Sequence, residues 1–444
     1  MAANNTQDLN LVAYSLISQF LRQQNLTATL ECLGAEAPHI FADLEAHKSI
    51  SDHKPLTAIL EEHHLLTFQQ QLGQLSVQKR EDDELLRLGK GRMPTEPCQI
   101  MEGIHYANIL STAAATLPTN LFPDAEIASP TVSVIVTSST DKTVKISQAD
   151  NGRTLCVLDH QKAACLATDV YPADPAYMLT AGMDGAHHIV DIRTGQAVQS
   201  WKDHAKYVVR AKFAPWDEGS WVVTASYDRS VNFYQRTSEK GSEPRYEKKH
   251  SIMFRGAVES LCFLPPADPS APNAVPTLVV GCRDDNCLHY IDVDPQRAYP
   301  STPFNMNANG DDWISFTAMD LAPSPNGRYL ACYTDSKAGR IIVFRARSCV
   351  QARNLWGVVA DGFSQPRCCW DSSGRYLFAT SDDRKVYVLD VSSGQTVAKL
   401  EGHTETIRSI SFDKERQRLL SCSFDKTVRV WETTEGVEEA GVQR

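Results

Sequence analysis

Short apolar runs alternate with polar turns along most of the chain, from about residue 98 to residue 433. In the last unit, residues 407–412 and 419–421 read as two strands, and a tight turn then leads into a third run that ends at Trp431. An aspartate occupies the corresponding turn seven times, at successive spacings of 43, 44, 57, 50, 48 and 42 residues. These residues are Asp141, Asp184, Asp228, Asp285, Asp335, Asp383 and Asp425. The pattern predicts seven similar β-rich units.

The last unit carries the most regular set of residues. Gly402 and His403 open it, and Trp431 closes the strand that follows the turn. In this respect the unit resembles a WD40 repeat, a family in which about 40–45 residues form one blade of a β-propeller. The resemblance implies an all-β, seven-bladed WD40 β-propeller over residues 98–433. It also implies that an opening histidine bonds the turn aspartate of its own blade. The candidates are His160, His204 and His403, with His105 as a further candidate for Asp141.

The ends of the propeller are expected to meet within one blade. Residues 98–103 are similar to residues 397–402, which form an outer strand leading into the last unit. We therefore predict that residues 98–102 supply the closing strand of the last blade, so that no sheet edge is left open. Residues 89–97 are interpreted as a linker, and residues 434–444 as a flexible tail.

The first 88 residues follow a helical pattern instead. Apolar residues between positions 9 and 33 recur at helical spacing, and Asn25 interrupts the run. Residues 1–40 resemble the LisH motif, a short helix pair that commonly dimerises. The residues expected to dimerise are Leu16, Ile17, Phe20, Leu21, Leu26 and Leu30. The alternative, a hairpin packed on the propeller's own flank, stays open. Residues 41–88 are expected to form a helical or coiled-coil extension.

Composition restricts the ligands. The chain has 44 basic and 54 acidic residues, a net charge of −10, which argues against nucleic acid or an anionic membrane as the main ligand. No apolar run is long enough for a membrane span. Twelve scattered cysteines without a CxxC pair favour buried thiols in a reducing compartment, the cytoplasm and/or the nucleus. Since the histidines lie in separate units and no nucleophile motif occurs, we expect no metal, no cofactor and no catalysis.

The WD40 resemblance also implies where partners bind. A common site in that family is one rim of the central channel, formed by residues just before each innermost strand. The corresponding residues here are Lys162, Lys206, Tyr207, Arg255, Trp313, Phe363 and Glu405. The main hypothesis is therefore a non-catalytic protein-interaction scaffold. It would be a homodimer through its LisH-like region and would recruit protein partners through its propeller.

Two other functions remain open. Residues 189–193 resemble the Trp-Asp-x-Arg box with which some WD40 proteins dock on a ubiquitin-ligase adaptor, although Val190 replaces the tryptophan. In that case the chain would be a substrate receptor or subunit of a ubiquitin ligase. Otherwise Arg193 is a solvated residue at a strand end. The acidic net charge is also compatible with a chaperone for a basic client protein.

Overall fold

The structure is a computed structural model that describes residues 2–39, 56, 85, 91–125, 127–215, 218–265, 275–360 and 365–435. The chain divides into two compact units, Met1–Asp83 and Glu84–Arg444, which are described separately. The expected extension over residues 41–88 lies outside the described residues, apart from Leu56 and Leu85. Most of the expected tail, residues 436–444, lies outside them too.

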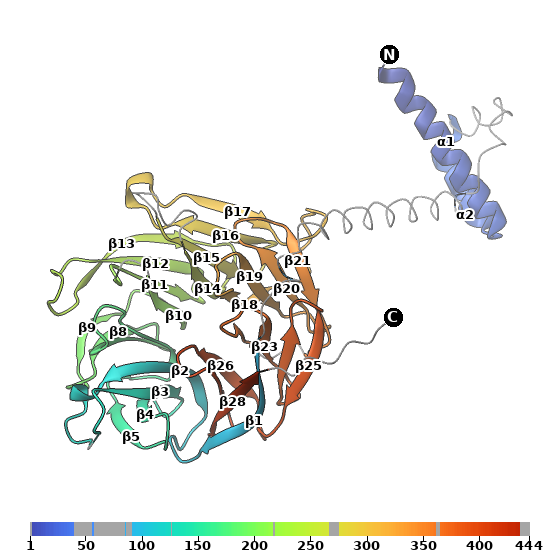
Figure 1. Ribbon diagram of the computed structural model, residues 1–444. Helices are drawn as coiled ribbons and strands as arrows, with labels where there is room; N and C mark the ends of the chain where they lie inside the picture. Colours follow the sequence, from blue (N-terminus) through green and yellow to red (C-terminus); the bar gives the residue numbers. More distant parts are fainter. Residues whose placement is uncertain are drawn as a thin grey trace. The chain divides into compact units, whose positions relative to one another are not determined.

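The first unit contains two helices, α1 (Ala2–Gln23) and α2 (Thr27–Glu36) (Figure 1). Asn25 ends the first helix with a left-handed backbone, φ 58°, a conformation that asparagine tolerates better than most residues. Leu16 and Leu21 of α1 are buried, whereas α2 has no buried residue. Leu26, at the start of α2, leaves 46% of its surface exposed. The helix pair therefore presents apolar side chains that its own described residues do not cover.

The second unit consists of seven four-stranded antiparallel sheets around a central channel, which confirms the predicted seven-bladed β-propeller (Figure 1). The first strand of each blade contacts the first strands of both neighbouring blades, so these seven strands form a closed inner ring. Blade 1 contains β2 (Ile109–Pro118), β3 (Thr131–Ser139), β4 (Val144–Gln148) and β5 (Thr154–Leu158). Blade 2 contains β6 (Cys165–Val170), β7 (Tyr177–Gly182), β8 (His187–Asp191) and β9 (Ala197–Trp201). Blade 3 contains β10 (Val208–Phe213), β11 (Trp221–Ser226), β12 (Ser230–Arg236) and β13 (Tyr246–Met253).

The remaining blades repeat this order from inner to outer strand. Blade 4 contains β14 (Val258–Leu264), β15 (Thr277–Cys282), β16 (Cys287–Asp292) and β17 (Ser301–Asn305). Blade 5 contains β18 (Ala318–Pro323), β19 (Tyr329–Thr334), β20 (Ile341–Arg345) and β21 (Gln351–Leu355). Blade 6 contains β22 (Cys368–Trp370), β23 (Tyr376–Thr380), β24 (Val386–Asp390) and β25 (Gln395–Leu400). Blade 7 contains β26 (Ile407–Asp413), β27 (Arg418–Ser423), β28 (Val428–Glu435) and β1 (Arg92–Met101). Short 3-10 helices, η2 (Thr119–Leu121) and η3 (Pro295–Arg297), lie in two connections.

Blade 7 joins the two ends of the propeller. Its outer strand β1 precedes all other strands in the sequence and pairs antiparallel with β28, with Met101 opposite Val428. The strand begins at Arg92, six residues before the expected start, so residues 92–97 belong to the sheet rather than to a linker. Irregular pairing at Pro94 and Pro97 accommodates the prolines, which an outer strand tolerates because its outer edge forms no ladder.

The apolar core lies between neighbouring sheets. Trp431 of blade 7, for example, is 1% exposed and belongs to one cluster with Phe378 and Val388 of blade 6. Leu85 is fully buried against residues of blades 5 and 6. All twelve cysteines are free thiols. Neither of the helices that the structure describes is long and apolar enough to span a bilayer.

Candidate protein-interaction face

The turn aspartates tie the loops of the propeller to its blades. In blade 7, His403 Nδ1 lies 2.8 Å from Asp425 Oδ2, and His403 Nε2 lies 2.8 Å from Ser421 Oγ. The backbone N–H of Thr404 donates to the same carboxylate at 3.1 Å. Burial alone would raise the pKa of Asp425, but the hydrogen bonds from His403 and Thr427 outweigh it and hold the pKa well below its usual range. The loop before β26 is thereby fixed to the β27–β28 turn.

Blades 1 and 3 contain the same arrangement. His105 Nδ1 lies 2.9 Å from Asp141, and His204 Nδ1 lies 3.1 Å from Asp228. Each Nε2 atom contacts a buried threonine, at 2.9 Å and 2.8 Å respectively. Burial lowers the pKa of both histidines, although the aspartates favour the charged form, so both imidazoles are neutral near pH 7. The structure thus brings His105, His204 and His403 to the aspartates that the sequence paired with them.

In blade 2 a glutamine, not a histidine, occupies the position of His105, His204 and His403. His160 lies 2.9 Å from Thr180, and its ring packs edge-on against His188 rather than contacting Asp184. Burial and the neighbouring His188 lower the pKa of His160 to about 4. Gln161 is the residue four positions before β6, as His204 is four positions before β10, and it donates to Thr180 at 2.6 Å. Gln161 therefore occupies the position that the sequence analysis assigned to His160, and the predicted hydrogen bond from His160 to Asp184 is wrong.

Blades 4 and 6 supply the partner from the strand after the turn. His289 Nε2 lies 2.8 Å from Asp285, and the Tyr387 hydroxyl donates to Asp383 at 3.0 Å. Each partner follows its aspartate by four residues. In blade 5, Asp335 accepts from the Thr317 N–H at 2.7 Å. Six of the seven aspartates accept from the backbone N–H two residues further along, as Asp425 does from Thr427. Asp335 is the exception, since it directly follows β19 and lies one position earlier than the turn aspartates of blades 3 and 7.

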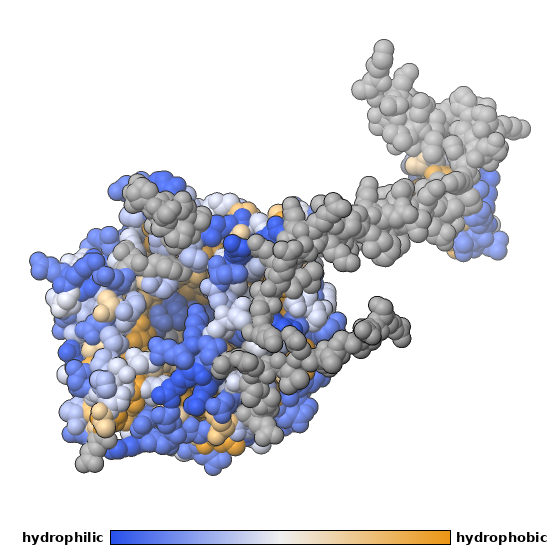
Figure 2. All heavy atoms as spheres, in the orientation of Figure 1, coloured by the Kyte–Doolittle hydropathy of each residue, from blue (hydrophilic) through white to orange (hydrophobic). Residues whose placement is uncertain are grey.

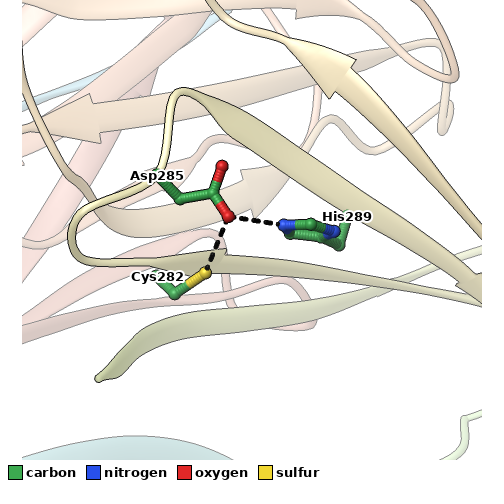
Figure 3. Close-up of side chains that lie close together, drawn as sticks. All are labelled: Cys282, Asp285 and His289. Atoms are coloured by element: carbon green, nitrogen blue, oxygen red, sulfur yellow. Dashed lines mark hydrogen bonds and ion pairs between the residues drawn. The ribbon is translucent and has the colours of Figure 1, made fainter. Parts of the chain in front are cut away.

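The Asp285 turn holds three potential metal ligands. The Cys282 Sγ and His289 Nε2 atoms point to the same oxygen of Asp285 (Figure 3), at 3.7 Å and 2.8 Å. Among the described residues, Cys282, Asp285 and His289 each offer one potential ligand atom, and these three atoms lie within 4.8 Å of one another. Burial raises the pKa of the Cys282 thiol well above its usual range, so the thiol stays protonated and donates. Hydrogen bonds to Asp285 therefore account for the cluster.

In blades 1, 3, 5 and 7 these bonds hold the connection that precedes the inner strand, on one side of the propeller. In blades 4 and 6 the backbone N–H groups of Arg283 and Asp382 hold it instead, through the carbonyls of Ala257 and Val359. We call this side the loop face. It comprises the connections before the inner strands, and their described residues are 102–108, 159–164, 202–207, 254–257, 306–317, 356–360 with 365–367, and 401–406. Each connection lies next to the turn that carries the aspartate of its blade. The loop face is therefore built on anchored backbone, a good support for binding residues.

Exposed apolar side chains gather on the loop face. Ten large apolar residues of the described propeller are exposed, and seven of them lie in these connections or directly beside one. The seven are Tyr106, Tyr207, Met253, Trp313, Ile314, Trp356 and Val359. The other three, Ile100, Val157 and Val397, lie on the outermost strands β1, β5 and β25. This distribution, taken from the exposed fractions of the side chains, singles out the loop face. Figure 2 shows one side of the propeller, where hydrophilic atoms predominate and smaller apolar patches lie between them.

The most exposed of these residues stands on a rigid support. Trp313 is 78% exposed, yet its backbone N–H donates to Asp311 at 3.1 Å and its carbonyl accepts from Asn307 at 2.7 Å. Arg340 lies beside it, between the rings of Phe316 and Trp356, at 5.4 Å and 5.1 Å from their centroids. Trp313, Phe316 and Arg340 line a hollow of about 230 Å³. Because the backbone that carries Trp313 is already ordered, it loses little conformational entropy on binding.

Comparison with known proteins identifies the repeat. The family WD40 (WD domain, G-beta repeat) matches residues 365–390 and 394–432, which lie in blades 6 and 7. The chain carries WD40 repeats in these two blades of its propeller. It is 26% identical to COMPASS component SWD3 of Saccharomyces cerevisiae over 113 residues, 26% of this chain and 34% of that protein. It is 22% identical to nuclear distribution protein PAC1 of Arthroderma benhamiae over 279 residues, 58% of this chain and 56% of that protein.

A shorter match has higher identity. The chain is 38% identical to the U5 small nuclear ribonucleoprotein 40 kDa protein of Mus musculus over 66 residues, 15% of this chain and 18% of that protein. The WD40 chain thus spans about half or less of the length of each of these relatives.

The predicted rim residues that the structure describes lie on the loop face. Six are exposed there: Lys162, Lys206, Tyr207, Arg255, Trp313 and Glu405. The seventh, Phe363, lies outside the described residues. The sequence analysis did not find Tyr106, Met253 or Trp356. Their positions in the chain could have indicated them, because Tyr106 follows the anchored His105, and Met253 and Trp356 lie at the ends of outer strands.

Arg193 follows β8 and lies at the end of its blade that is opposite the loop face. Its guanidinium binds Asp191 through two hydrogen bonds of 2.9 Å and 2.8 Å and also donates to the Tyr177 hydroxyl at 3.0 Å. These hydrogen bonds raise the pKa of Arg193 above its usual range, and those to Asp191 have the largest effect. The side chain is 48% exposed but already has a bidentate partner, which favours a structural role over docking.

Proposed function

We propose that this WD40 protein is a non-catalytic scaffold that recruits protein partners through its loop face. The concentration of exposed apolar residues on that face, on anchored backbone, carries the proposal. Aromatic and arginine side chains contribute most of the binding energy in protein interfaces, and Trp313, Trp356 and Tyr207 are of this type. Relatives named as a COMPASS component and a ribonucleoprotein protein support a role in complexes, in the cytoplasm and/or the nucleus.

The test compares two sides of the propeller. We expect the double variant Trp313→Ala/Trp356→Ala to bind the partner that the wild-type chain captures at least tenfold more weakly, a loss of about 1.4 kcal/mol or more. Its melting temperature should stay within about 2 °C of wild type, because both side chains are at least half exposed. The measurement is the dissociation constant for that partner, by surface plasmon resonance.

The matched control is Val157→Ala/Val397→Ala, which removes two exposed apolar side chains from outer strands. This control should bind with wild-type affinity. Equal binding by the loop-face variant would contradict the proposed site.

We also propose that the helical unit forms a homodimer in the manner of the LisH motif. The support is the exposed Leu26, the half-exposed Ile17 and the absence of a buried residue in α2. A helix pair this small needs a further apolar surface to be stable. A second copy of the same unit would provide it.

Light scattering tests the dimer. We expect the full chain to have twice the monomer mass, and a chain beginning at Glu84 to have the monomer mass. Leu26→Asp should also give the monomer, because it places a charge in the proposed contact, whereas Gln24→Asp should leave the dimer intact. A full-length chain that remains monomeric at micromolar concentrations would refute this interface.

A further inference from the structure

Arginines from several blades meet inside the central channel. Arg210 of β10 in blade 3 donates to Asp320 of β18 in blade 5 at 2.7 Å. Arg367, just before β22 in blade 6, lies 3.9 Å from the same carboxylate. Because blades 3 and 5 are not neighbours in the ring, the Arg210–Asp320 pair has to reach across the channel.

A second chain of contacts crosses at the same level. Arg408 of blade 7 donates to the side-chain oxygen Oε1 of Gln365, and Nε2 of the same side chain donates to the Tyr227 hydroxyl of blade 3 at 2.6 Å. Tyr227 in turn donates to Glu259 at 2.8 Å, and Arg283 pairs with that carboxylate. Side chains of blades 3 to 7 are thus joined in one polar layer across the channel.

This layer has more positive than negative groups. Among the described residues that form it there are four guanidinium groups and two carboxylates, those of Glu259 and Asp320. Glu259 neutralises Arg283, and Asp320 can neutralise one further arginine. Two charges therefore have no carboxylate partner in the described layer, one of them on Arg408, whose contact Gln365 is neutral. Arg367 is only 9% exposed and shares Asp320 with Arg210, so its buried charge is only partly compensated, which is unfavourable.

The electrostatic environment of these arginines is consistent with that excess. Burial lowers the pKa of Arg367 far below its usual range, and the positive charges of Arg210 and Arg408 add to the effect. Burial and the Arg210 charge likewise lower the pKa of Arg408. The groups that oppose these shifts are Cys422 beside Arg408 and, from the layer, Asp320, Glu259 and Tyr227.

A cavity of about 590 Å³ adjoins the layer inside the channel. Four basic residues, Arg210, Lys212, Arg367 and Lys414, and two carboxylates, Asp169 and Asp320, line it, whereas Arg408 belongs to the adjoining layer. Lys212 is paired with Asp169 at 2.7 Å. Thr112 and Ser411 also line it, and their hydroxyl oxygens have no hydrogen-bond partner in the described structure. The cavity is large enough for a small molecule and is bordered by unmatched positive charge.

We propose that the central channel binds a compact anion carrying phosphate groups, held by Arg210, Arg367 and Arg408. Guanidinium groups present paired N–H donors that match phosphate oxygens, and several of them around a small cavity suit an anion with several charges. The anion would supply the missing negative charge and join blades 3, 6 and 7. This site lies inside the channel, apart from the exposed apolar residues of the loop face, although Arg367 ends one of the loop-face connections. It does not depend on the proposed function.

Calorimetry on the full chain tests the site. The probes are inorganic phosphate, pyrophosphate and inositol hexakisphosphate, with a hexaglutamate peptide as a non-phosphate polyanion. We expect at least one phosphate probe to bind with one ion per chain and more tightly than the peptide. Preference for inositol hexakisphosphate would assign a phosphorylated polyol, and preference for pyrophosphate an inorganic or nucleotide-like diphosphate. Tighter binding of the peptide, or no binding of any phosphate probe at 1 mM, would overturn the proposal.

Variants locate the binding. Arg408→Gln should weaken the bound phosphate probe at least tenfold, and Arg408→Lys, which keeps the charge, should weaken it less. Without ligand, Arg408→Gln should fold with an unchanged or higher melting temperature because it removes a repelling charge. Arg416→Gln, at an outer surface pair with Asp150, is the matched control and should bind like wild type. Unchanged affinity in Arg408→Gln would place the anion elsewhere and contradict the site.

Discussion

A chain that begins at Gly103, and so lacks β1, will not form a stable propeller, whereas a chain that begins at Glu84 will unfold cooperatively near the melting temperature of the full protein. Without β1, the edge of β28 is open and Met101 no longer fills the core between blades 7 and 1. Removing one such buried side chain costs about 2–5 kcal/mol, and loss of the strand's hydrogen bonds adds to it. Circular dichroism during heating and size-exclusion chromatography measure the difference.

The control for this truncation is a peptide of residues 84–102 added to the shortened chain. The peptide should bind and raise the melting temperature, because it restores both β1 and the buried Leu85. Equal melting temperatures for the two truncated chains would show that β1 does not close the propeller.

Trp431→Ala will lower the free energy of unfolding by about 3–5 kcal/mol. Trp431 is 1% exposed, packs between blades 6 and 7, and donates from Nε1 to Ser421 Oγ at 2.9 Å. Ser421 also contacts His403, so the substitution leaves a cavity and disturbs the bonds that fix the Asp425 turn. Urea denaturation followed by fluorescence or circular dichroism gives the value.

Two further variants separate volume from hydrogen bonding. Trp431→Phe keeps much of the ring but not the N–H, so it should cost less than Trp431→Ala. Val157→Ala removes an exposed side chain of β5 and should change the free energy of unfolding by about 0.5 kcal/mol or less. A loss below about 1 kcal/mol for Trp431→Ala would mean that this tryptophan does not hold blades 6 and 7 together.

The number of blades followed from the sequence because an aspartate caps the same turn in six of the seven blades, and Asp335 lies close to that turn in blade 5. In several blades the tight turn after the second strand contains a left-handed residue, such as Lys142, Arg229 or Lys426. The aspartate directly before it caps the turn by accepting from the backbone N–H of the next residue but one. The partner of that aspartate was harder to predict. His160 and His204 both precede their aspartates by 24 residues, but the distance from β6 to its turn is one residue shorter than that from β10. Residue counts alone cannot show whether the one-residue difference lies before the inner strand or between that strand and the turn.

The binding features that the sequence analysis missed depend on contacts between distant residues. Arg340 lies between Phe316 and Trp356, which belong to two different connections. Arg210 and Asp320 are 110 residues apart and meet only because the ring closes. No local spacing marks such pairs, whereas exposed residues beside the anchored histidines could be assigned to the loop face from the WD40 resemblance.

Hydrogen exchange of the full chain, with and without its captured partner, tests the central claim most directly. If the loop face recruits partners, amide exchange will slow in residues 306–317 and 356–360 when the partner binds, and will stay unchanged in residues 149–153 and 192–196 at the other ends of the blades. Slower exchange confined to those latter turns, with the loop face unaffected, would contradict the account.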